Sequence, residues 1–280
     1  MSGAYCVLMP LAPWEPAWVV AASLASLEQQ SLLPVALVIS CDGPPPEPLR
    51  AVLKRCKLPL VMAQGPGGEG AGPAPQRGLE VCPTDLVVRA DADDLNLPGR
   101  CERLVNVMEQ RPDLAALGSW IGEFVQTQPE APLQHLRERR VPSGADALQR
   151  FSRWRNPLNH PSTILRREQI TAAGGYRAMT SFEDYDLWLR LLAQGQRLDN
   201  LAETLVLARV DPAHRRRRHG RSYLAAELRF VTICLREKLL APWVALLWLL
   251  LRCPTRLLPQ GLLAGLIQHR LRQPPAMGAH

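Results

Sequence analysis

Three carboxylates directly follow an apolar run of this sequence. The run 86–90 leads into Asp91, Asp93 and Asp94, so three acids fall within four positions. Carboxylates this close repel one another and raise each other's pKa unless a divalent cation or a ring of hydrogen-bond donors lies among them. A metal site is one interpretation. The other is a solvated acidic turn that opens a helix near Pro98, because acids are favoured at helix starts, and these residues alone leave both open.

A second acidic pair, Glu183-Asp184, stands at the beginning of the predicted helix 182–193. Acids at a helix N-terminus are ordinary partners of the helix dipole. A carboxylate at a strand-to-helix corner can also take a proton from a hydroxyl group as a general base. The polar loop 156–162 carries His160 between two prolines that hold its shape. A lone histidine is more often structural than catalytic, so the residues alone favour a structural role there.

The elements that would position these acids alternate between strand and helix. Short apolar runs bounded by turn residues predict strands, and apolar residues at helical spacing predict helices between them. The strands are expected at 5–9, 35–40, 58–63 and 86–90, and the helices at 17–27, 49–56 and 76–81. Such alternation implies a parallel sheet with functional groups at the carboxyl ends of its strands. Asp42 and the acids at 91–94 both occupy such ends.

The second half of the chain predicts shorter and less regular strands. These are expected at 114–120, 163–165 and 204–210, with helices at 98–111, 167–173 and 182–193. Gly174-Gly175 ends the middle helix, because one glycine takes the left-handed position after it. The stretch 122–141 is polar and contains Pro129 and Pro132, so it is expected to be an irregular connection.

The positive charge of the chain is concentrated near its end. The net charge is +7, but residues 213–280 hold 12 Lys/Arg and 2 Asp/Glu, which leaves −3 for residues 1–212. This asymmetry indicates a negatively charged partner: a phospholipid surface, a nucleic acid or a diphosphate. Nucleic-acid binding calls for aromatic residues or a recognition element beside the arginine run 215–218. Contact with anionic lipid or a lipid diphosphate is therefore favoured.

An apolar run at 239–251 has 13 residues without a charge, whereas a membrane-spanning helix needs about 20. Trp243, Trp248 and the flanking arginines favour a helix lying in a membrane interface. The alternative is a helical hairpin packed on the rest of the protein. Seven singly placed cysteines, and an N-terminus without a secretory pattern, predict reduced thiols in a cytosolic protein.

Motifs spread over residues 4–210 together resemble the family 2 glycosyltransferases with a GT-A fold. The resemblance is to bacterial enzymes of exopolysaccharide and O-antigen assembly, amylovoran biosynthesis glycosyltransferases among them. The motifs occur in the family's order and spacing: Val7-Leu8-Met9-Pro10, Val38 to Pro44, Gln76-Arg77-Gly78-Leu79, Arg89 to Asp94, Asn156 to Ser162, Ala173 to Arg177 and Glu183 to Leu191.

The resemblance implies a role for each acid. Asp91 and Asp93 match the family's Asp-x-Asp motif, whose carboxylates hold the ribose and a Mg²⁺ or Mn²⁺ on the donor diphosphate, and Asp94 lies beside them. Asp184 matches the acid of a Glu-Asp pair that deprotonates the acceptor hydroxyl, with Glu183 as its neighbour. The chemistry agrees, since a cation stabilises a departing diphosphate and a base must act on the opposite face of the sugar.

The resemblance also implies a donor-binding set. Asp42 matches the acid that contacts the nucleotide base or ribose, and Trp14 stands next to the position where the family has an aromatic residue. The other expected members of this set are Pro10, Gln76, Arg77, His160, His214 and Arg215.

The expected fold is α/β of the GT-A kind, Rossmann-like, with a mostly parallel central sheet flanked by helices and a C-terminal helical membrane-associating extension. Residues 1–212 are expected to form the glycosyltransferase domain, with a nucleotide-binding half at 1–97 and an acceptor half at 98–212. Residues 213–280 form the basic, apolar helical extension.

The expected function is inverting, metal-dependent transfer of a sugar from a nucleotide-sugar donor to a hydroxyl of an oligosaccharide, carried on a polyprenyl diphosphate. The expected location is peripheral, on the cytoplasmic, inner face of the plasma membrane, with no nucleic-acid partner. Two other functions stay open. A sugar-phosphate nucleotidyltransferase would release pyrophosphate without needing Asp184. A basic nucleic-acid-binding protein with a vestigial α/β domain would lose binding on substitution of 215–218.

Overall fold

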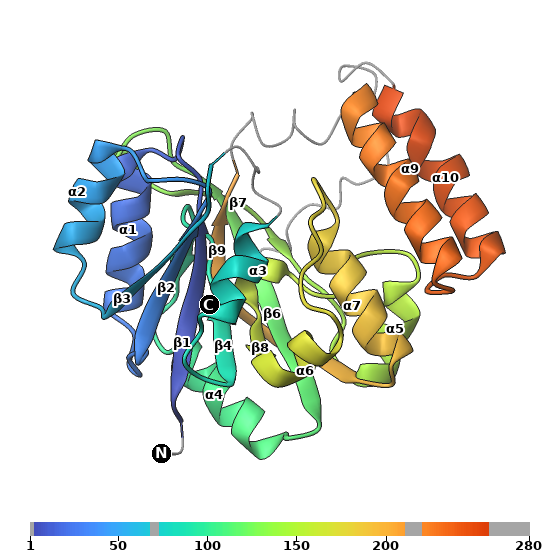
Figure 1. Cartoon of the computed structure of the whole chain (residues 1–280), viewed down its shortest axis with the longest axis horizontal. Coiled ribbons are helices and arrows are strands. Elements are labelled where there is room, and N and C mark those ends of the chain that lie inside the picture. Colours follow the sequence, from blue (N-terminus) through green and yellow to red (C-terminus); the bar gives the residue numbers. More distant parts are fainter. Residues whose placement is uncertain (1–2, 68–72, 211–219, 258–280) are drawn as a thin grey trace, which may run out of the picture. The chain divides into compact units, whose positions relative to one another are not determined.

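The computed structural model describes residues 3–67, 73–210 and 220–257, which belong to two compact units, Met1–Asp211 and Pro212–His280. The described part of the first unit contains one sheet of nine strands with helices on both faces (Figure 1). Its hydrogen-bonded order is β3-β2-β1-β4-β8-β6-β9-β5, and β7 pairs with β6. The α/β fold of the GT-A kind, with C-terminal helices, is confirmed.

The first half of the sheet is parallel. It consists of β1 (Tyr5–Leu11), β2 (Ala36–Cys41), β3 (Leu60–Gln64) and β4 (Leu86–Arg89). The helices between these strands are α1 (Ala17–Glu28), α2 (Glu47–Arg55) and α3 (Ala74–Glu80). Because parallel strands end at the same edge, the residues after β1, β2 and β4 come together there.

The second half of the sheet is mixed. Its strands are β5 (Leu95–Asn96), β6 (Leu114–Val125), β7 (Gln134–Arg139), β8 (Ile164–Arg166) and β9 (Arg197–Arg209). β8 is antiparallel to both β4 and β6, whereas β6 and β9 are parallel. Its helices are α4 (Arg100–Gln110), α5 (Ala145–Ser152), the 3₁₀ turn η1 (His160–Ser162), α6 (Arg167–Ala172) and α7 (Glu183–Ala193).

Two apolar cores fix the layers. One face of the sheet packs against α1, α2 and α4, and the other against α3, α5, α6 and α7. Strand β1 shows how the sequence achieves this, since Val7 and Met9 enter the first core while Cys6 and Leu8 enter the second. Alternate side chains of a strand point to opposite faces, so a strand buried on both sides is apolar throughout.

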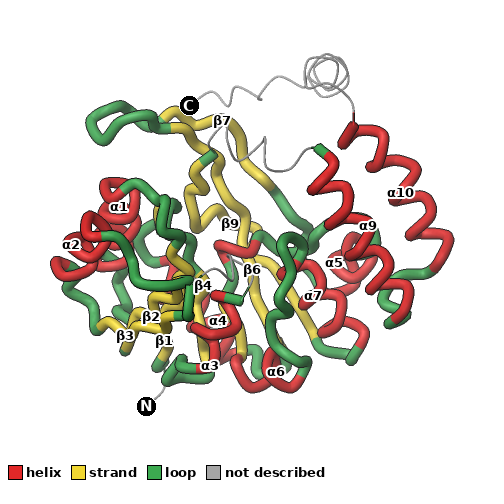
Figure 2. The backbone as a smooth tube through the Cα atoms, turned by 45° about the horizontal axis from the view of Figure 1, so that its top comes forward, coloured by secondary structure: helices red, strands yellow, loops and turns green. Residues whose placement is uncertain are grey.

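The structure corrects the expected irregular connection at 122–141. β6 continues to Val125, and β7 pairs with it as an antiparallel strand that stands beside β6 in Figure 2. β7 is exposed along most of its length and shows no apolar alternation. The backbone ladder and the cross-strand pair of Arg137 with Glu123, 2.7 Å between Nε and Oε2, stabilise it instead. Helix α5 and the first half of β9 were also not predicted.

The second unit contains two helices among its described residues, α9 (Arg221–Arg236) and α10 (Pro242–Leu257), which pack on each other. The rings of Phe230 and Trp248 meet edge to face, and Arg252 Nη1 lies 3.3 Å from Oε1 of the buried Glu227. Within the described part of the chain, neither these nor any other helix combines the length and apolarity that crossing a membrane requires.

Candidate functional site

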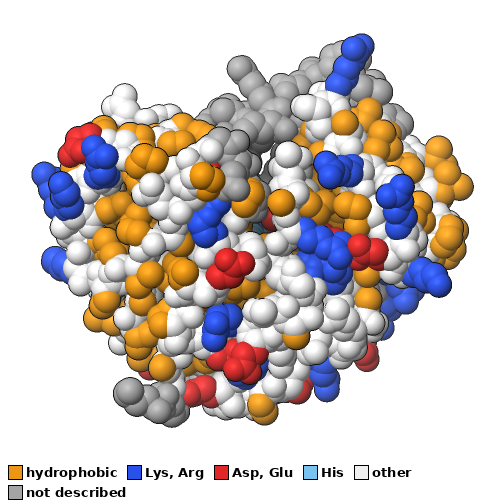
Figure 3. Space-filling view, viewed as in Figure 1, with side chains coloured by type: hydrophobic (Ala, Val, Ile, Leu, Met, Phe, Trp, Pro, Cys, Tyr) orange, Lys and Arg blue, Asp and Glu red, His pale blue; other side chains and the backbone are white. Residues whose placement is uncertain are grey.

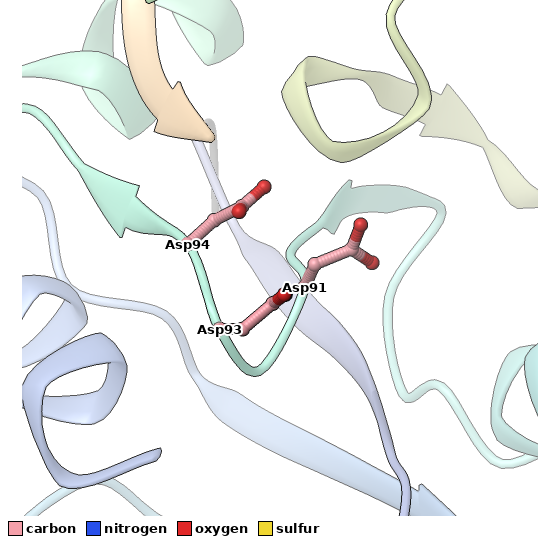
Figure 4. A group of neighbouring side chains, drawn as sticks. All are labelled: Asp91, Asp93 and Asp94. Atoms are coloured by element: carbon pink, nitrogen blue, oxygen red, sulfur yellow. The ribbon is translucent and has the colours of Figure 1, made fainter. Parts of the chain in front are cut away.

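The three aspartates lie in one turn between β4 and β5, at the carboxyl end of the parallel strands (Figure 4). The backbone N–H of Asp94 donates to the carbonyl of Asp91 across 3.3 Å, which closes the turn. One carboxylate oxygen from each of Asp91, Asp93 and Asp94 can be chosen so that all three lie within 4.8 Å of one another. The sequence therefore brings three oxygen ligands to a single point of the sheet edge.

The electrostatics of this turn are unfavourable for anions alone. Burial, followed by the charges of Asp91 and Glu15, raises the pKa of Asp93 to about 7. Burial and the charge of Asp93 raise the pKa of Asp94 as well. Arg209 at the end of β9 partly compensates Asp93 and Asp94: its backbone N–H donates to Asp94 Oδ1 at 2.9 Å and its Nε donates to the Asp93 carbonyl at 3.1 Å.

A divalent cation fits this set of ligands. Carboxylate oxygens are hard donors of the kind that Mg²⁺ and Mn²⁺ prefer, and a positive charge among them removes the repulsion that raises their pKa values. Asp91 is already partly neutralised, because Arg89 Nη2 lies 2.6 Å from its Oδ1. A bound cation would therefore relieve the like-charge repulsion of Asp93 and Asp94 most. Asp91 would provide the third carboxylate ligand.

The second acidic pair begins α7. Phe182, the residue before the helix, has a left-handed backbone with φ of 70°, an unusual conformation for a non-glycine residue that turns the chain into the helix. Both oxygens of the Asp184 carboxylate accept hydrogen bonds, Oδ2 from Asn156 Nδ2 at 2.6 Å and Oδ1 from the Tyr185 backbone at 2.7 Å. Burial and the charge of Asp184 raise the pKa of the neighbouring Glu183 to about 7.

His160 and Tyr176 form a buried pair near both acidic groups. His160 Nε2 is 2.9 Å from the Tyr176 hydroxyl. Burial, followed by the positive charge of Arg89, lowers the pKa of His160 to about 4, while Asp184 and Asp91 act in the opposite direction. The pKa of Tyr176 is raised by burial and responds to the same two acids. Both carboxylate groups therefore act on one His-Tyr pair that is neutral at neutral pH.

Four of the predicted donor-binding residues, Pro10, Trp14, Asp42 and Arg77, lie at or beside the ends of β1 and β2. Arg77 Nη1 donates to the carbonyl of Cys41 at 3.1 Å, next to Asp42. Pro10 lies in β1, and Trp14, in the turn after it, is 64% exposed.

Gln76 bridges two elements of the fold. Its Oε1 accepts the Tyr176 backbone N–H at 2.8 Å, and its Nε2 donates to Glu80 at 2.9 Å. In this arrangement the Gln76 side chain joins α3 to the segment before α7. His214 and Arg215 lie outside the described residues.

Sequence reasoning missed several polar residues of the site. Arg89 is 5% exposed within β4, and a buried arginine in an apolar strand signals an acidic partner nearby. Arg100 is fully buried and its Nη2 donates to the carbonyls of Arg89 and Pro161 at 2.6 and 2.7 Å, so it links the acidic turn to the loop 156–162. Asn156 stood within a recognised motif, but only the fold reveals its partner.

Comparison with known proteins agrees with this arrangement. Residues 17–179 match the family described as glycosyl transferase family 2. The chain is 34% identical over 238 residues to the amylovoran biosynthesis glycosyltransferase AmsE of Erwinia amylovora, covering 84% of this chain and 87% of that protein. It is 31% identical over 209 residues to the UDP-Gal:alpha-D-GlcNAc-diphosphoundecaprenol beta-1,3-galactosyltransferase of Escherichia coli, covering 74% of each.

Among solved structures, the fold resembles S. aureus TarS 1–349 in complex with UDP-GlcNAc, with a TM-score of 0.59 and 18% identity. The match covers 82% of this chain and 66% of that one, and at this identity it bears on the fold alone. The family match spans more than half of the sequence and agrees with relatives above 30% identity. By its sequence, the chain belongs to glycosyl transferase family 2.

Proposed function

We propose that this glycosyltransferase moves a sugar from a nucleotide-sugar to a hydroxyl of an oligosaccharide in bacterial surface polysaccharide synthesis, in one inverting step. The observation that carries the proposal is the presence of two separate acidic groups, Asp91, Asp93 and Asp94 in one turn at the sheet edge and the hydrogen-bonded Asp184 at the beginning of α7, both close enough to His160 and Tyr176 to influence their pKa values. A nucleotide-sugar held at the first group and an acceptor hydroxyl at the second can react between them. Sugar transfer is aided by a cation at the departing diphosphate and a base at the attacking hydroxyl, which explains two separate acidic groups.

On the donor side, Asp91, Asp93 and Asp94 hold Mg²⁺ or Mn²⁺, and Asp42 and Arg77 contact the nucleotide. The cation supplies positive charge to the diphosphate as it departs. Trp14 is exposed beside this edge and offers a stacking surface for the base. Pro10 and His160 line the same donor site, while Gln76 shapes it by holding the backbone of Tyr176.

On the acceptor side, Asp184 is the general base. Its carboxylate takes the proton of the acceptor hydroxyl while the hydroxyl oxygen attacks the anomeric carbon, and the bond from that carbon to the diphosphate oxygen breaks. Asp184 is preferred to Glu183 as the base because hydrogen bonds from the Asn156 amide and the Tyr185 backbone hold its carboxylate in a fixed orientation.

The acceptor is proposed to be linked to a polyprenyl diphosphate and presented at the inner face of the plasma membrane. The name of the Escherichia coli relative specifies a diphosphoundecaprenol acceptor. The second unit supports membrane contact, because α10 exposes an apolar stripe of Trp243, Leu246, Leu247, Leu250 and Leu251. Figure 3 shows apolar side chains over α9 and α10 with basic side chains among them. Residues 213–280 carry a net charge of +10, from 12 Lys/Arg and 2 Asp/Glu, which complements anionic lipid.

Two matched variants test the reaction. Asp93→Asn is expected to abolish both transfer and Mn²⁺-dependent nucleotide binding, whereas Asp184→Asn is expected to keep donor binding and lower transfer by at least about 100-fold. Before these variants are assayed, the donor is identified by screening nucleotide-sugars with Mn²⁺ for thermal shift and for donor hydrolysis. Transfer at the wild-type rate by either variant contradicts the proposal, and release of pyrophosphate by an active Asp184→Asn protein indicates a nucleotidyltransferase instead.

A further inference from the structure

A side-chain amide holds the Asp184 carboxylate. Asn156 Nδ2 donates to Asp184 Oδ2 at 2.6 Å, from a loop residue 28 positions before Asp184. The Tyr185 backbone N–H donates to the other oxygen at 2.7 Å. A carboxylate oxygen has two lone pairs, so each oxygen keeps one for a further donor. The two bonds together fix the plane of the carboxylate while leaving it able to accept a hydroxyl proton.

Asn156 is itself held in place. Its Oδ1 accepts the Leu158 backbone N–H at 3.4 Å, and a flipped amide would direct the carbonyl oxygen at the Asp184 carboxylate, so the donor orientation follows from the contacts. The next residue is a buried proline, whose carbonyl accepts from Asn200 Nδ2 of β9 at 3.0 Å. Asn159 Nδ2 donates to the carbonyl of Ser119 in β6 at 2.9 Å. The loop is thus anchored to two strands of the sheet.

Asp184 stands among titratable and charged groups, but the described groups that donate hydrogen bonds to its carboxylate are uncharged. Glu183 on the same helix, and His160 and Tyr176 on the segments packed beside it, titrate in response to the Asp184 charge. Arg89 and Asp91 act on all three of these groups from β4 and the turn after it. Within the described residues, the donors that contact the Asp184 carboxylate are the Asn156 amide and the Tyr185 backbone, and both are uncharged.

We propose that Asn156 is a positioning residue for the general base: its amide N–H fixes the orientation of the Asp184 carboxylate and stabilises its charge before the acceptor hydroxyl arrives. This inference rests on the proposed role of Asp184. It assigns the beginning of the loop 156–162 to the acceptor side of the reaction. Asn156 is expected to act through Asp184 without touching the reacting atoms.

Asn156→Asp tests this role with almost no change in shape. The substitution replaces an N–H donor by an oxygen facing Asp184 Oδ2, and two carboxylates this close share a proton. In a plot of kcat against pH, the acidic limb is expected to move to higher pH by one unit or more, while the KM for the donor stays unchanged. Gln149→Glu adds the same charge at an exposed position of α5 and is expected to leave the profile unmoved.

Asn156→Ala removes the donor without adding a charge. It is expected to lower kcat by about tenfold and to shift the acidic limb of the pH profile less than Asn156→Asp does. If Asn156→Asp does not fold, Asn156→Ala answers the same question, and an unchanged kcat and limb overturn the inference. Failure of the inference differs from failure of the proposed function. Inactive Asp184→Asn with a wild-type profile for Asn156→Asp overturns the positioning role alone, whereas full transfer by Asp184→Asn overturns both.

Discussion

The guanidinium of Arg89 and the carboxylate of Asp91 form an asymmetric ion pair. Their Nη2 and Oδ1 atoms lie 2.6 Å apart, and the side chains are 6% and 35% exposed. The Arg89 guanidinium is therefore buried, while the Asp91 carboxylate is partly exposed at the acidic turn. Arg89 also donates to the carbonyls of Leu8 and Ala90, so it joins β1 and β4 to the acidic turn.

This asymmetry predicts opposite effects for two neighbouring acids. Asp91→Asn leaves a buried cation without its charge partner, which is expected to lower the free energy of unfolding by about 1–3 kcal/mol. Asp93→Asn removes a carboxylate whose pKa is raised to about 7 by burial and like charges, so it is expected to raise that free energy by about 1 kcal/mol at pH 8, after allowing for water at this half-buried group. Urea unfolding in EDTA measures both, and equal destabilisation by the two variants contradicts the prediction.

Glu183 gives the metal-free protein a defined pH dependence. Its pKa is about 7 in the folded protein, against an ordinary value of 4.5. Below the ordinary value Glu183 is protonated in both the folded and the unfolded state. Between there and pH 7 the unfolded chain loses the proton first, so stability falls as pH rises through this range and then levels off. Glu183→Gln is expected to match the wild type near pH 4 and to be more stable at pH 8. A difference that is largest at low pH contradicts this assignment.

Gly78 explains why a glycine stands inside helix α3. A Cβ there would meet Leu8 Cδ1 and lie 3.0 Å from Ser40 Cβ, so α3 packs on β1 and β2 too closely for a side chain. Alanine favours a helix over glycine by about 1 kcal/mol. Gly78→Ala is nevertheless expected to lower the free energy of unfolding by about 1–3 kcal/mol because of overpacking.

A double-mutant cycle checks the cause. In a Leu8→Ala background the space is available, so Gly78→Ala is expected to cost little there. An equal cost in both backgrounds contradicts the close-packing explanation.

Much of the fold follows from local sequence. The strands around Val7, Val38 and Val88 are apolar throughout because helices cover both faces of the sheet, and such continuous apolar runs can be recognised in the sequence. β7 was missed because backbone pairing with β6 stabilises it, and an exposed strand with alternating charges carries no apolar signal. The true start of β9 was missed because residues 197–203 are mostly exposed or polar and pair with β6 through the backbone.

The candidate site was predictable only in part. Acids at strand ends and helix starts are recognisable one motif at a time, as with Asp93 and Asp184. The partners that set their charge come from elsewhere in the chain, since Arg209 reaches Asp94 over 115 positions and Asn156 reaches Asp184 over 28. Such contacts depend on which strands become neighbours, and no local pattern encodes that.

The apolar stripe of α10 predicts binding to anionic membranes. Val244, Ala245 and Trp248 are buried, yet Leu246 and Leu250 on another side of the helix are 58% and 61% exposed. An exposed apolar stripe beside basic residues marks an interaction surface. Leu246→Ser with Leu250→Ser is expected to weaken binding to phosphatidylglycerol vesicles by at least about tenfold, because inserting each leucine contributes about 1.5 kcal/mol or more.

Vesicle sedimentation at two salt concentrations measures this binding, and high salt is expected to weaken it because charges contribute. The control is Leu33→Ser with Val35→Ser, which removes two apolar side chains that are 55% and 50% exposed in the first unit. This control is expected to bind as the wild type does. If instead the α10 variant keeps its vesicle binding but loses a concentration-dependent dimer in light scattering, the stripe contacts a second copy of the chain and the membrane assignment is wrong.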